Sequence, residues 1–455
     1  MRVISRRRVL GLALAAWPAL AGCRVDPYEV AGAPRLAPTA PAGRELLLWH
    51  ADAGPGERVF ARELGPRFAE ERNGLVLTAL AHGDPDDLLR RAGQAEAGGV
   101  GPDVIQVPGE WMTEAAEGKL VRPLLDDEAA RLLAPDVWAP KLTEAARYQG
   151  SWYGVPAAGW FRQPFFNDEL LRNAGLVQTG RTTPPSTWAE YADVCKRVAA
   201  PEDRWGAALP SQRGDEELFL HVYQHVHAAG GELPRPRAGR IGLDTPQLRS
   251  ALEFLLDLVR SRGALPLDRP PFPVAELGRA GLWWASSQWS RTQAAVGSTL
   301  RLGAALVPSA APGGGRGVIL RSRHWCLGRH GASRDDGLDL LRFLAGEDVS
   351  HAYCASLWLP PAKPNNAEKP PYRPAAGTPT PFATLWPAIL EQLGQPDNLP
   401  LVTYPVYRAL AGRIAGEFVL ALTGKKPIAT ALSEGEAGAN ELLRQGQLGV
   451  SFRFS

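Results

Sequence analysis

Cysteine is scarce in this chain, with four among 455 residues. Cys23 lies close to the N-terminus, which leaves Cys195, Cys326 and Cys354 in the rest of the sequence. Because three is an odd number, at least one of these thiols is free. An oxidising compartment would permit a disulfide between Cys326 and Cys354. The alternative is that these cysteines are small, buried, apolar side chains with free thiols.

The chain also lacks a large excess of charge of one sign and long apolar runs. The 50 basic and 48 acidic residues give a formal net charge of +2. No nucleic-acid partner is expected, because that function needs a clustered basic face. Beyond the N-terminus no run reaches the roughly 18 apolar residues that a spanning helix requires. Membrane contact is therefore expected at the N-terminus alone.

Motifs for catalysis and for metal binding are absent as well. The sequence contains no Gly-x-Ser-x-Gly, no phosphate-binding loop and no His-Glu-x-x-His. His221 and His225 have a spacing that can chelate zinc, but no cysteine or carboxylate pattern completes such a site. Glu216 and Glu217 are adjacent and point apart on a helix, so they are not expected to form a catalytic acid pair. We predict no metal, no cofactor and no enzymatic activity.

The N-terminus has the pattern of an export signal. Arg2 and residues 6–8 are basic, and a mostly apolar stretch over 9–20 is too short to span a bilayer. Residues 20–23, Leu-Ala-Gly-Cys, resemble the lipobox of bacterial lipoproteins, in which the cysteine receives a lipid. Residues 5–10 also resemble a twin-arginine motif, so both export routes stay open.

Residues 24–43 are rich in Pro, Ala and Gly and predict a flexible tether between a lipidated Cys23 and the folded body. That body, about 410 residues long, is too long for one core and suits two lobes. Segments 44–50, 75–80 and 103–107 read as buried strands, and amphipathic helices are expected between them. Strands that alternate with helices predict an α/β fold.

Ligands of open α/β sheets bind beyond the carboxyl ends of the strands. This rule places His50 and Asp52 after the first strand, and Glu110 and Trp111 after the third, at a binding edge. Further along, Thr187 and Glu190 form a capping-box pattern for a helix from Trp188, which we interpret as a packing residue.

Five short motifs occur in a particular order along the chain: Leu47–His50, Pro102–Val107, Tyr153–Pro156, Pro184–Trp188 and Thr423–Lys426. Together, behind a lipobox and over residues 44–445, they resemble the carbohydrate-binding extracellular solute-binding proteins of bacterial ABC importers, typified by maltose-binding protein. The resemblance implies two α/β lobes, each with a mixed, mostly parallel sheet flanked by helices, joined by hinge strands.

The resemblance assigns residues 1–23 to the signal peptide, 44–158 and 308–348 to lobe 1, and 159–307 and 349–455 to lobe 2. The chain crosses between lobes near 157–159 and 303–307 and again before the C-terminal helices. The implied protein is a monomer, lipid-anchored on the outer face of the cytoplasmic membrane. It captures a sugar and delivers it to an ABC permease and ATPase.

Fourteen tryptophans favour sugar binding, because the apolar face of a pyranose stacks on an aromatic ring. The resemblance matches Trp289 to a sugar-stacking aromatic and Glu110 to a cleft carboxylate. Strand ends and crossings supply the other candidates: His50, Asp52, Trp111, Trp160, Phe161, Arg321, Trp325 and Tyr404. Core packing of the tryptophans and macrodipole-favoured positions for the two acids are the competing interpretations.

Two departures from the family pattern concern the ligand. Where the family has a small residue, Ala and Met before its ligand-side turn, this chain has Ala280-Gly281-Leu282, followed by Trp283 and Trp284, and segment 321–325 is unusually basic. The basic segment would suit a phosphorylated polyol or another anion. A lipid-anchored carbohydrate-active enzyme is a more distant alternative, which would need two carboxyl groups at glycosidase separation in the cleft.

Overall fold

The computed structural model describes most of the chain beyond the predicted tether. Its described ranges are 45–72, 75–199, 203–210, 216–261, 263–295, 299–331, 333–373 and 385–447. The predicted signal peptide, Cys23 and the tether lie outside these residues.

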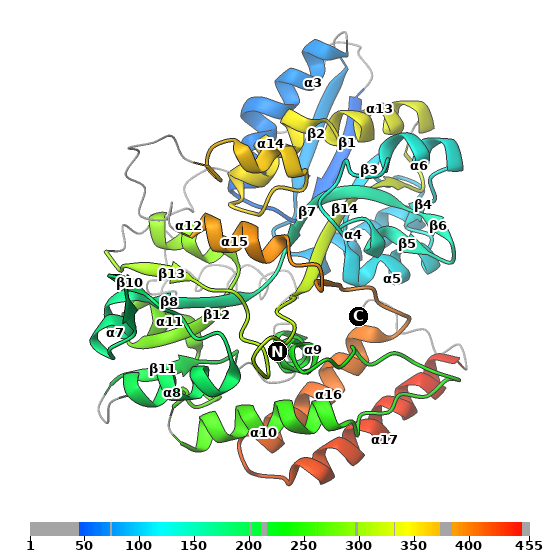
Figure 1. The fold of residues 1–455 in the computed structure, drawn as a ribbon. Coiled ribbons are helices and arrows are strands. Elements are labelled where there is room, and N and C mark those ends of the chain that lie inside the picture. Colours follow the sequence, from blue (N-terminus) through cyan, green and yellow to red (C-terminus); the bar gives the residue numbers. More distant parts are fainter. Residues whose placement is uncertain are drawn as a thin grey trace, which may run out of the picture. The chain divides into compact units, whose positions relative to one another are not determined.

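The first sheet has the strand order β15-β14-β3-β1-β2, with β4 and β7 also paired to β14 (Figure 1). Its strands β3, β1 and β2, which are neighbours in the sheet, run parallel, as the alternation of strands and helices predicts. The long strand β14 runs antiparallel to β3 and β7, so the sheet is mixed. The strands are β1 (Glu45–His50), β2 (Val76–Ala81), β3 (Val104–Pro108), β4 (Val121–Arg122), β7 (Gly154–Trp160), β14 (Ile319–Gly328) and β15 (Leu399–Pro400).

The second sheet has the order β11-β12-β8-β13. Within it β11 and β12 run parallel, whereas β8 runs antiparallel to β12 and β13. The expectation of a mostly parallel sheet is therefore wrong for this half, because β8 continues directly from β7 and enters from the opposite direction. Its strands are β8 (Gln163–Asn167), β11 (Trp205–Ala208), β12 (Ala280–Ala285) and β13 (Leu302–Ala304).

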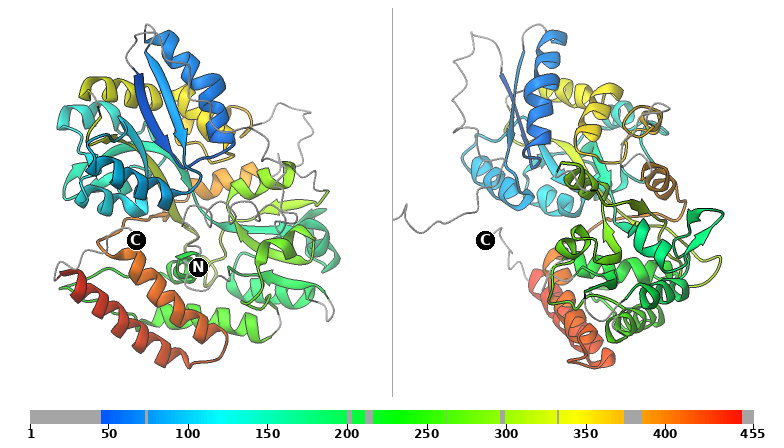
Figure 2. Two further views of the ribbon diagram at one scale, coloured as in Figure 1. Left: turned by 180° about the vertical axis from the view of Figure 1, so that it is seen from behind. Right: turned by 90° about the vertical axis from the view of Figure 1, so that its left-hand side faces the viewer.

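Helices flank both sheets. Around the first sheet lie α2 (Pro55–Val59), α3 (Gly65–Glu71), α4 (Pro85–Ala97), η2 (Gly109–Trp111), α5 (Met112–Glu117), α6 (Asp126–Leu132), α13 (Arg334–Leu344) and α14 (Glu347–Ser356). The others are α7 (Asp168–Asn173), α8 (Trp188–Val198), α9 (Glu216–Ala228), α10 (Pro246–Arg260), α11 (Pro271–Glu276), α12 (Ser287–Ala295), α15 (Trp386–Leu393), α16 (Tyr407–Leu422) and α17 (Ile428–Gln447). Figure 2 shows α10, α16 and α17 packed side by side.

The predicted start of α8 is confirmed. The Thr187 hydroxyl accepts from the Glu190 N–H at 3.2 Å and caps the helix. The Glu190 carboxylate reaches back to the Ser186 N–H at 2.7 Å, one residue earlier than in the usual capping box. Trp188 is buried and stacks on Phe254 at 4.7 Å between ring centroids, in agreement with its interpretation as a packing residue.

The chain passes three times between the sheets, and the first passage contributes a residue to the candidate site described below. It occurs at Phe161 and Arg162, between β7 and β8, slightly later than predicted (Figure 1). The second passage lies between β13 and β14, and the third leads from β15 into α16 through residues 401–406.

One part of the predicted division differs from the structure. The predicted second lobe includes residues 349–455, but α14 packs on α2 and β7 of the first half. The physical reason is Tyr353, whose buried ring packs on Phe60 and Trp325 and whose hydroxyl bonds to Asp52. Strand β15 also pairs with the first sheet.

Cys195, Cys326 and Cys354 are all buried and free. The alternative of a Cys326–Cys354 disulfide is therefore wrong, and the thiols are small packing residues. Burial raises the pKa of each thiol, because the thiolate is unfavourable in an apolar environment.

We predict that these three thiols are unreactive in the native state and all reactive after unfolding. Thiol titration of the Cys23→Ser protein with Ellman's reagent should give close to zero before denaturant and three after it. A count of one after unfolding would show that two of the cysteines are bridged.

Candidate functional site

A cavity of about 280 Å³ lies where the two halves of the fold meet. Its walls come from elements of both sheets, from the first crossing and from α9. The lining residues are Pro85, Glu110, Trp111, Trp160, Arg162, Glu217, Ser286, Gln288, Arg321 and Arg323.

The carboxyl end of β3 delivers the first pair of lining residues. Strand β3 runs directly into η2, so Glu110 and Trp111 lie at the binding edge that parallel strands predict. Gly109 makes this turn possible: a Cβ there would lie 2.8 Å from the Ser322 hydroxyl and 2.7 Å from the Ala145 methyl group. A glycine is therefore required for η2 to approach β14.

Because side chains alternate between the two faces of β14, two arginines of this strand lie on the same face. Residues two apart on a strand point the same way, and Arg321 and Arg323 both lie over the Trp160 ring, 5.2 and 4.9 Å from its centroid. Arg321 is also the register partner of Trp160 across β14 and β7. Strand pairing thus fixes this stack of two guanidinium groups on one indole.

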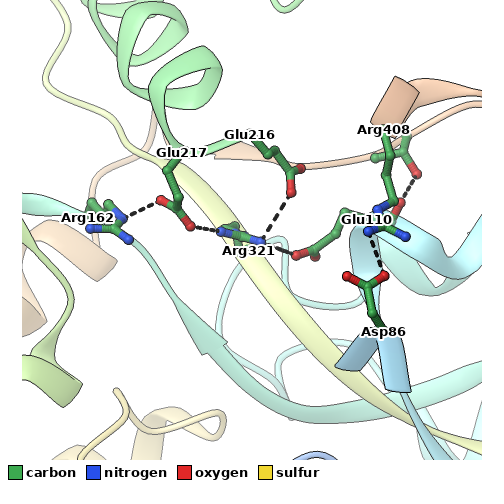
Figure 3. A network of polar contacts seen from close by, with 8 residues as sticks. Asp86, Glu110, Arg162, Glu216, Glu217, Arg321 and Arg408 are labelled. Carbon is green, nitrogen blue, oxygen red and sulfur yellow. Dashed lines mark hydrogen bonds and ion pairs between the residues drawn. The ribbon is translucent and has the colours of Figure 1, made fainter. Parts of the chain in front are cut away.

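Arg321 is the centre of an ionic network that joins both halves of the fold (Figure 3). Its guanidinium pairs with Glu110 of η2, donates to Glu217 at 2.7 Å and lies 3.6 Å from Glu216, both on α9. The other oxygen of Glu217 pairs with Arg162 of the first crossing at 2.5 Å. A buried charge needs such partners, because desolvation otherwise makes it very costly.

Burial and neighbouring charges shift the pKa values of the two glutamates of α9 in opposite directions. Burial opposes the ionisation of Glu217, but Arg321 and Arg162 hold its pKa below the usual range. Burial raises the pKa of Glu216 to about 7, a rise that Arg321 opposes and that Glu110 and Glu217 reinforce. Glu216 thus carries a proton for part of the time near neutral pH, whereas Glu217 is ionised.

A second ion pair joins the partly buried Arg323 to the buried Asp52. Asp52 also accepts from the Gln106 amide at 3.0 Å and from the Tyr353 hydroxyl. Burial alone would raise the pKa of Asp52, but Arg323 and these hydrogen bonds hold it below its ordinary value. Asp52 therefore lies behind the cavity wall and fixes Arg323.

Five further predicted residues do not line the cavity. His50 is fully buried against Phe60, and burial lowers its pKa to about 4. Trp289, matched by resemblance to a stacking aromatic, packs instead on Phe165 and Trp283 at 5.9 and 5.1 Å between centroids. The others are Phe161 and Trp325, both in the core, and Tyr404, whose ring contacts Tyr407.

Four predicted residues do come together in the cavity wall, namely Glu110, Trp111, Trp160 and Arg321. Sequence reasoning missed Arg162 and Glu217, whose partners are distant in sequence. Arg323 carried a signal, since it follows Arg321 by two residues on a predicted strand. Pro85, Ser286 and Gln288 carried none.

Residues 67–380 match the family model described as bacterial extracellular solute-binding protein. The chain belongs to this family. A binding protein of Brucella abortus is 22% identical over 325 residues, which cover 69% of this chain and 74% of that protein.

Solved structures show the same fold. The cyclic alpha-maltosyl-1,6-maltose binding protein of Arthrobacter globiformis aligns with a TM-score of 0.74, at 20% identity, over 89% of this chain and 100% of that one. An ABC transporter solute-binding protein of Thermotoga lettingae, bound to alpha-D-tagatose, gives a TM-score of 0.70, at 20% identity, over 88% and 100%.

These matches confirm the predicted two-lobed α/β fold. The matched family consists of solute-binding proteins, in agreement with the prediction that the chain is not an enzyme. Among the described residues, no helix combines the length and apolar character needed to span a bilayer.

We predict that Glu216 makes stability depend on pH. Its pKa in the folded protein lies above that of an unfolded glutamate, so its favourable contribution is complete below about pH 4.5 and is lost as the pH rises through 7. Glu216→Gln should match the wild type at pH 4.5 and exceed its free energy of unfolding at pH 8.

Urea unfolding at both pH values measures this difference, and Glu434→Gln on α17, whose side chain is 52% exposed, serves as a control. Equal pH dependence in the wild type and in Glu216→Gln would contradict the prediction.

Proposed function

We propose that the chain binds a neutral sugar in this cavity and delivers it to an ABC permease. The observation that carries the proposal is the match of charges at the site. Arg321 is opposed by Glu110 and Glu217, Glu217 is shared with Arg162, and Arg323 is opposed by Asp52. Three guanidinium groups thus meet three ionised carboxylates, with the partly protonated Glu216 beside Arg321, so the described residues of the site hold no unpaired positive charge for an anionic ligand to neutralise.

Several polar atoms of the wall retain hydrogen-bonding capacity. One Glu110 oxygen is a buried acceptor, and the Trp111 indole N–H and the Arg323 Nε are buried donors, with no hydrogen-bond partner among the described residues. A hydroxyl group both donates and accepts, so a polyol can satisfy donors and acceptors together. Bonds to charged groups are the stronger ones.

Two indole rings complete the match to a sugar. Trp111 and Trp160 line the same cavity as Glu110 and Arg323. Aromatic rings offer apolar surface to the C–H face of a sugar, while the polar atoms read its hydroxyl groups. The similar structures from Arthrobacter and Thermotoga are described with a maltosyl-maltose and with tagatose, which supports the same ligand class.

The anionic alternative is disfavoured by the same ion pairs. A phosphorylated polyol would have to approach Arg321 beside Glu110 and Glu217, whose negative charges oppose it. Arg323 is likewise committed to Asp52. A basic segment in the sequence is thus, in space, an array of neutralised pairs.

The cellular setting remains part of the proposal. The Leu-Ala-Gly-Cys segment supports lipidation at Cys23, with the tether 24–43 holding the body outside the cytoplasmic membrane. Export uses the general or the twin-arginine route. The protein acts as a monomer, and a ligand-loaded form meets the permease and its ATPase.

A thermal-shift screen of the purified protein tests the ligand class. Ligand that binds the folded state alone raises the melting temperature by mass action. We expect shifts with neutral mono- or oligosaccharides. Trp160→Ala and Glu110→Gln should each weaken the affinity for the best sugar about tenfold or more, equivalent to about 1.4 kcal/mol.

Trp289→Phe is the matched control, since Trp289 lies in the core and is expected to keep the affinity. Shifts with sugar phosphates alone would overturn the neutral-sugar proposal. A loss of affinity in Trp289→Phe that equals the loss in Trp160→Ala would move the stacking site to the position expected from the resemblance.

A further inference from the structure

Arg408 reaches from α16 to two elements of the first half (Figure 3). Its guanidinium lies over the Trp111 ring, 4.1 Å from the centroid, and pairs with Asp86 of α4 at 2.6 Å. Helix α16 itself packs against α9, α10 and α17, on the other side of the cavity. One side chain thus joins the two walls through a residue that lines the cavity.

The residues at the start of α16 do not favour a stable helix terminus. Val406, the residue that precedes α16, has φ of 61° and no capping hydrogen bond. This left-handed conformation is strained for a β-branched residue. A cation in the first turn is also opposed by the positive end of the helix macrodipole. Such local conflicts are expected where a function is served.

The segment before α16 is tied to the same wall. The Thr403 hydroxyl donates to the Glu110 carbonyl oxygen at 2.9 Å, and the Thr113 hydroxyl donates to the Thr403 carbonyl oxygen at 3.3 Å. Segment 401–406 is the third passage between the halves, so the strained Val406 lies between an anchored strand end and the helix that carries Arg408.

The ion pair with Asp86 is too exposed to hold the two walls together by itself. The Asp86 side chain is 57% exposed and that of Arg408 is 33% exposed, and exposed pairs contribute little. Trp111 is buried, so the cation–π contact between its ring and the Arg408 guanidinium is screened less by water than the exposed ion pair is. The planar guanidinium provides both contacts at once.

We propose that Arg408 is a positioning residue for the ligand site, a clamp that holds α16 against α4 and η2 and fixes the plane of the Trp111 indole. Its importance for ligand capture rests on the proposed function. The clamp itself is a property of the ligand-free protein: breaking it lets the walls separate and frees the indole to turn.

Distances between spin labels test the clamp. Full-length protein with Cys23→Ser carries labels at Gln94→Cys on α4 and Ser250→Cys on α10, two exposed positions. The three native body thiols are buried and stay unlabelled. Pulsed electron paramagnetic resonance without ligand should show longer distances in Arg408→Gln than in the parent.

Asp86→Asn provides a second variant, since a change at this exposed carboxylate does not endanger folding. It should shift the same distances in the same direction. Arg249→Gln is the control, because Arg249 also donates to an aspartate at 2.6 Å, on the exposed surface of α10. The control should leave the distances unchanged.

The indole is followed separately, by ¹⁹F NMR of protein labelled with 5-fluorotryptophan. The Trp111 resonance is assigned by its loss in Trp111→Phe, and it should move in Arg408→Gln but not in Arg249→Gln. A merely structural role for Arg408 would not move this one resonance selectively.

Unchanged distances in Arg408→Gln, or an equal change in Arg249→Gln, would overturn the proposal. An unmoved Trp111 resonance would overturn it as well. Both measurements are made without ligand, so a failure to find any bound sugar would count against the proposed function and leave the clamp to be decided by its own result.

Discussion

Arg321 lies on the strand that belongs to the first sheet, and its carboxylate partners come from η2 on one side and from α9 on the other. The guanidinium is largely withdrawn from water, with 16% of the side chain exposed, so losing these partners would leave a poorly solvated charge unpaired. That requirement fixes the positions of Glu110, Glu217 and, through Glu217, of Arg162. The cavity is the space that this network leaves between two sheets, with Trp160 as its floor under the two arginines.

A site built in this way favours ligands with many weak dipoles over ligands with charge. Each guanidinium already has a carboxylate, and each carboxylate holds remaining lone pairs for hydroxyl groups. The arrangement is also rigid, since moving one side chain would leave another buried charge without its partner. Preorganised partners of this kind reduce the entropy that binding has to overcome.

Much of the fold was accessible from the sequence because its signals are local. The alternation of strands and helices predicted the fold of the first half, and the Thr187 cap predicted the start of α8. The position of Glu110 and Trp111 after β3 predicted that both line the site. The signals failed where the deciding contact is distant. Tyr353 draws α14 to the first half through Asp52, and Glu217 meets Arg321 across 104 positions. The family resemblance matches Trp289 to a sugar-stacking aromatic, but its neighbours in the structure fill a core.

The free thiols described for the body have a consequence for its biosynthesis. A protein whose cysteines stay buried and unpaired needs no oxidant and no disulfide exchange to reach its native structure. The same body can therefore mature in the reducing cytoplasm or beyond the membrane, with one outcome.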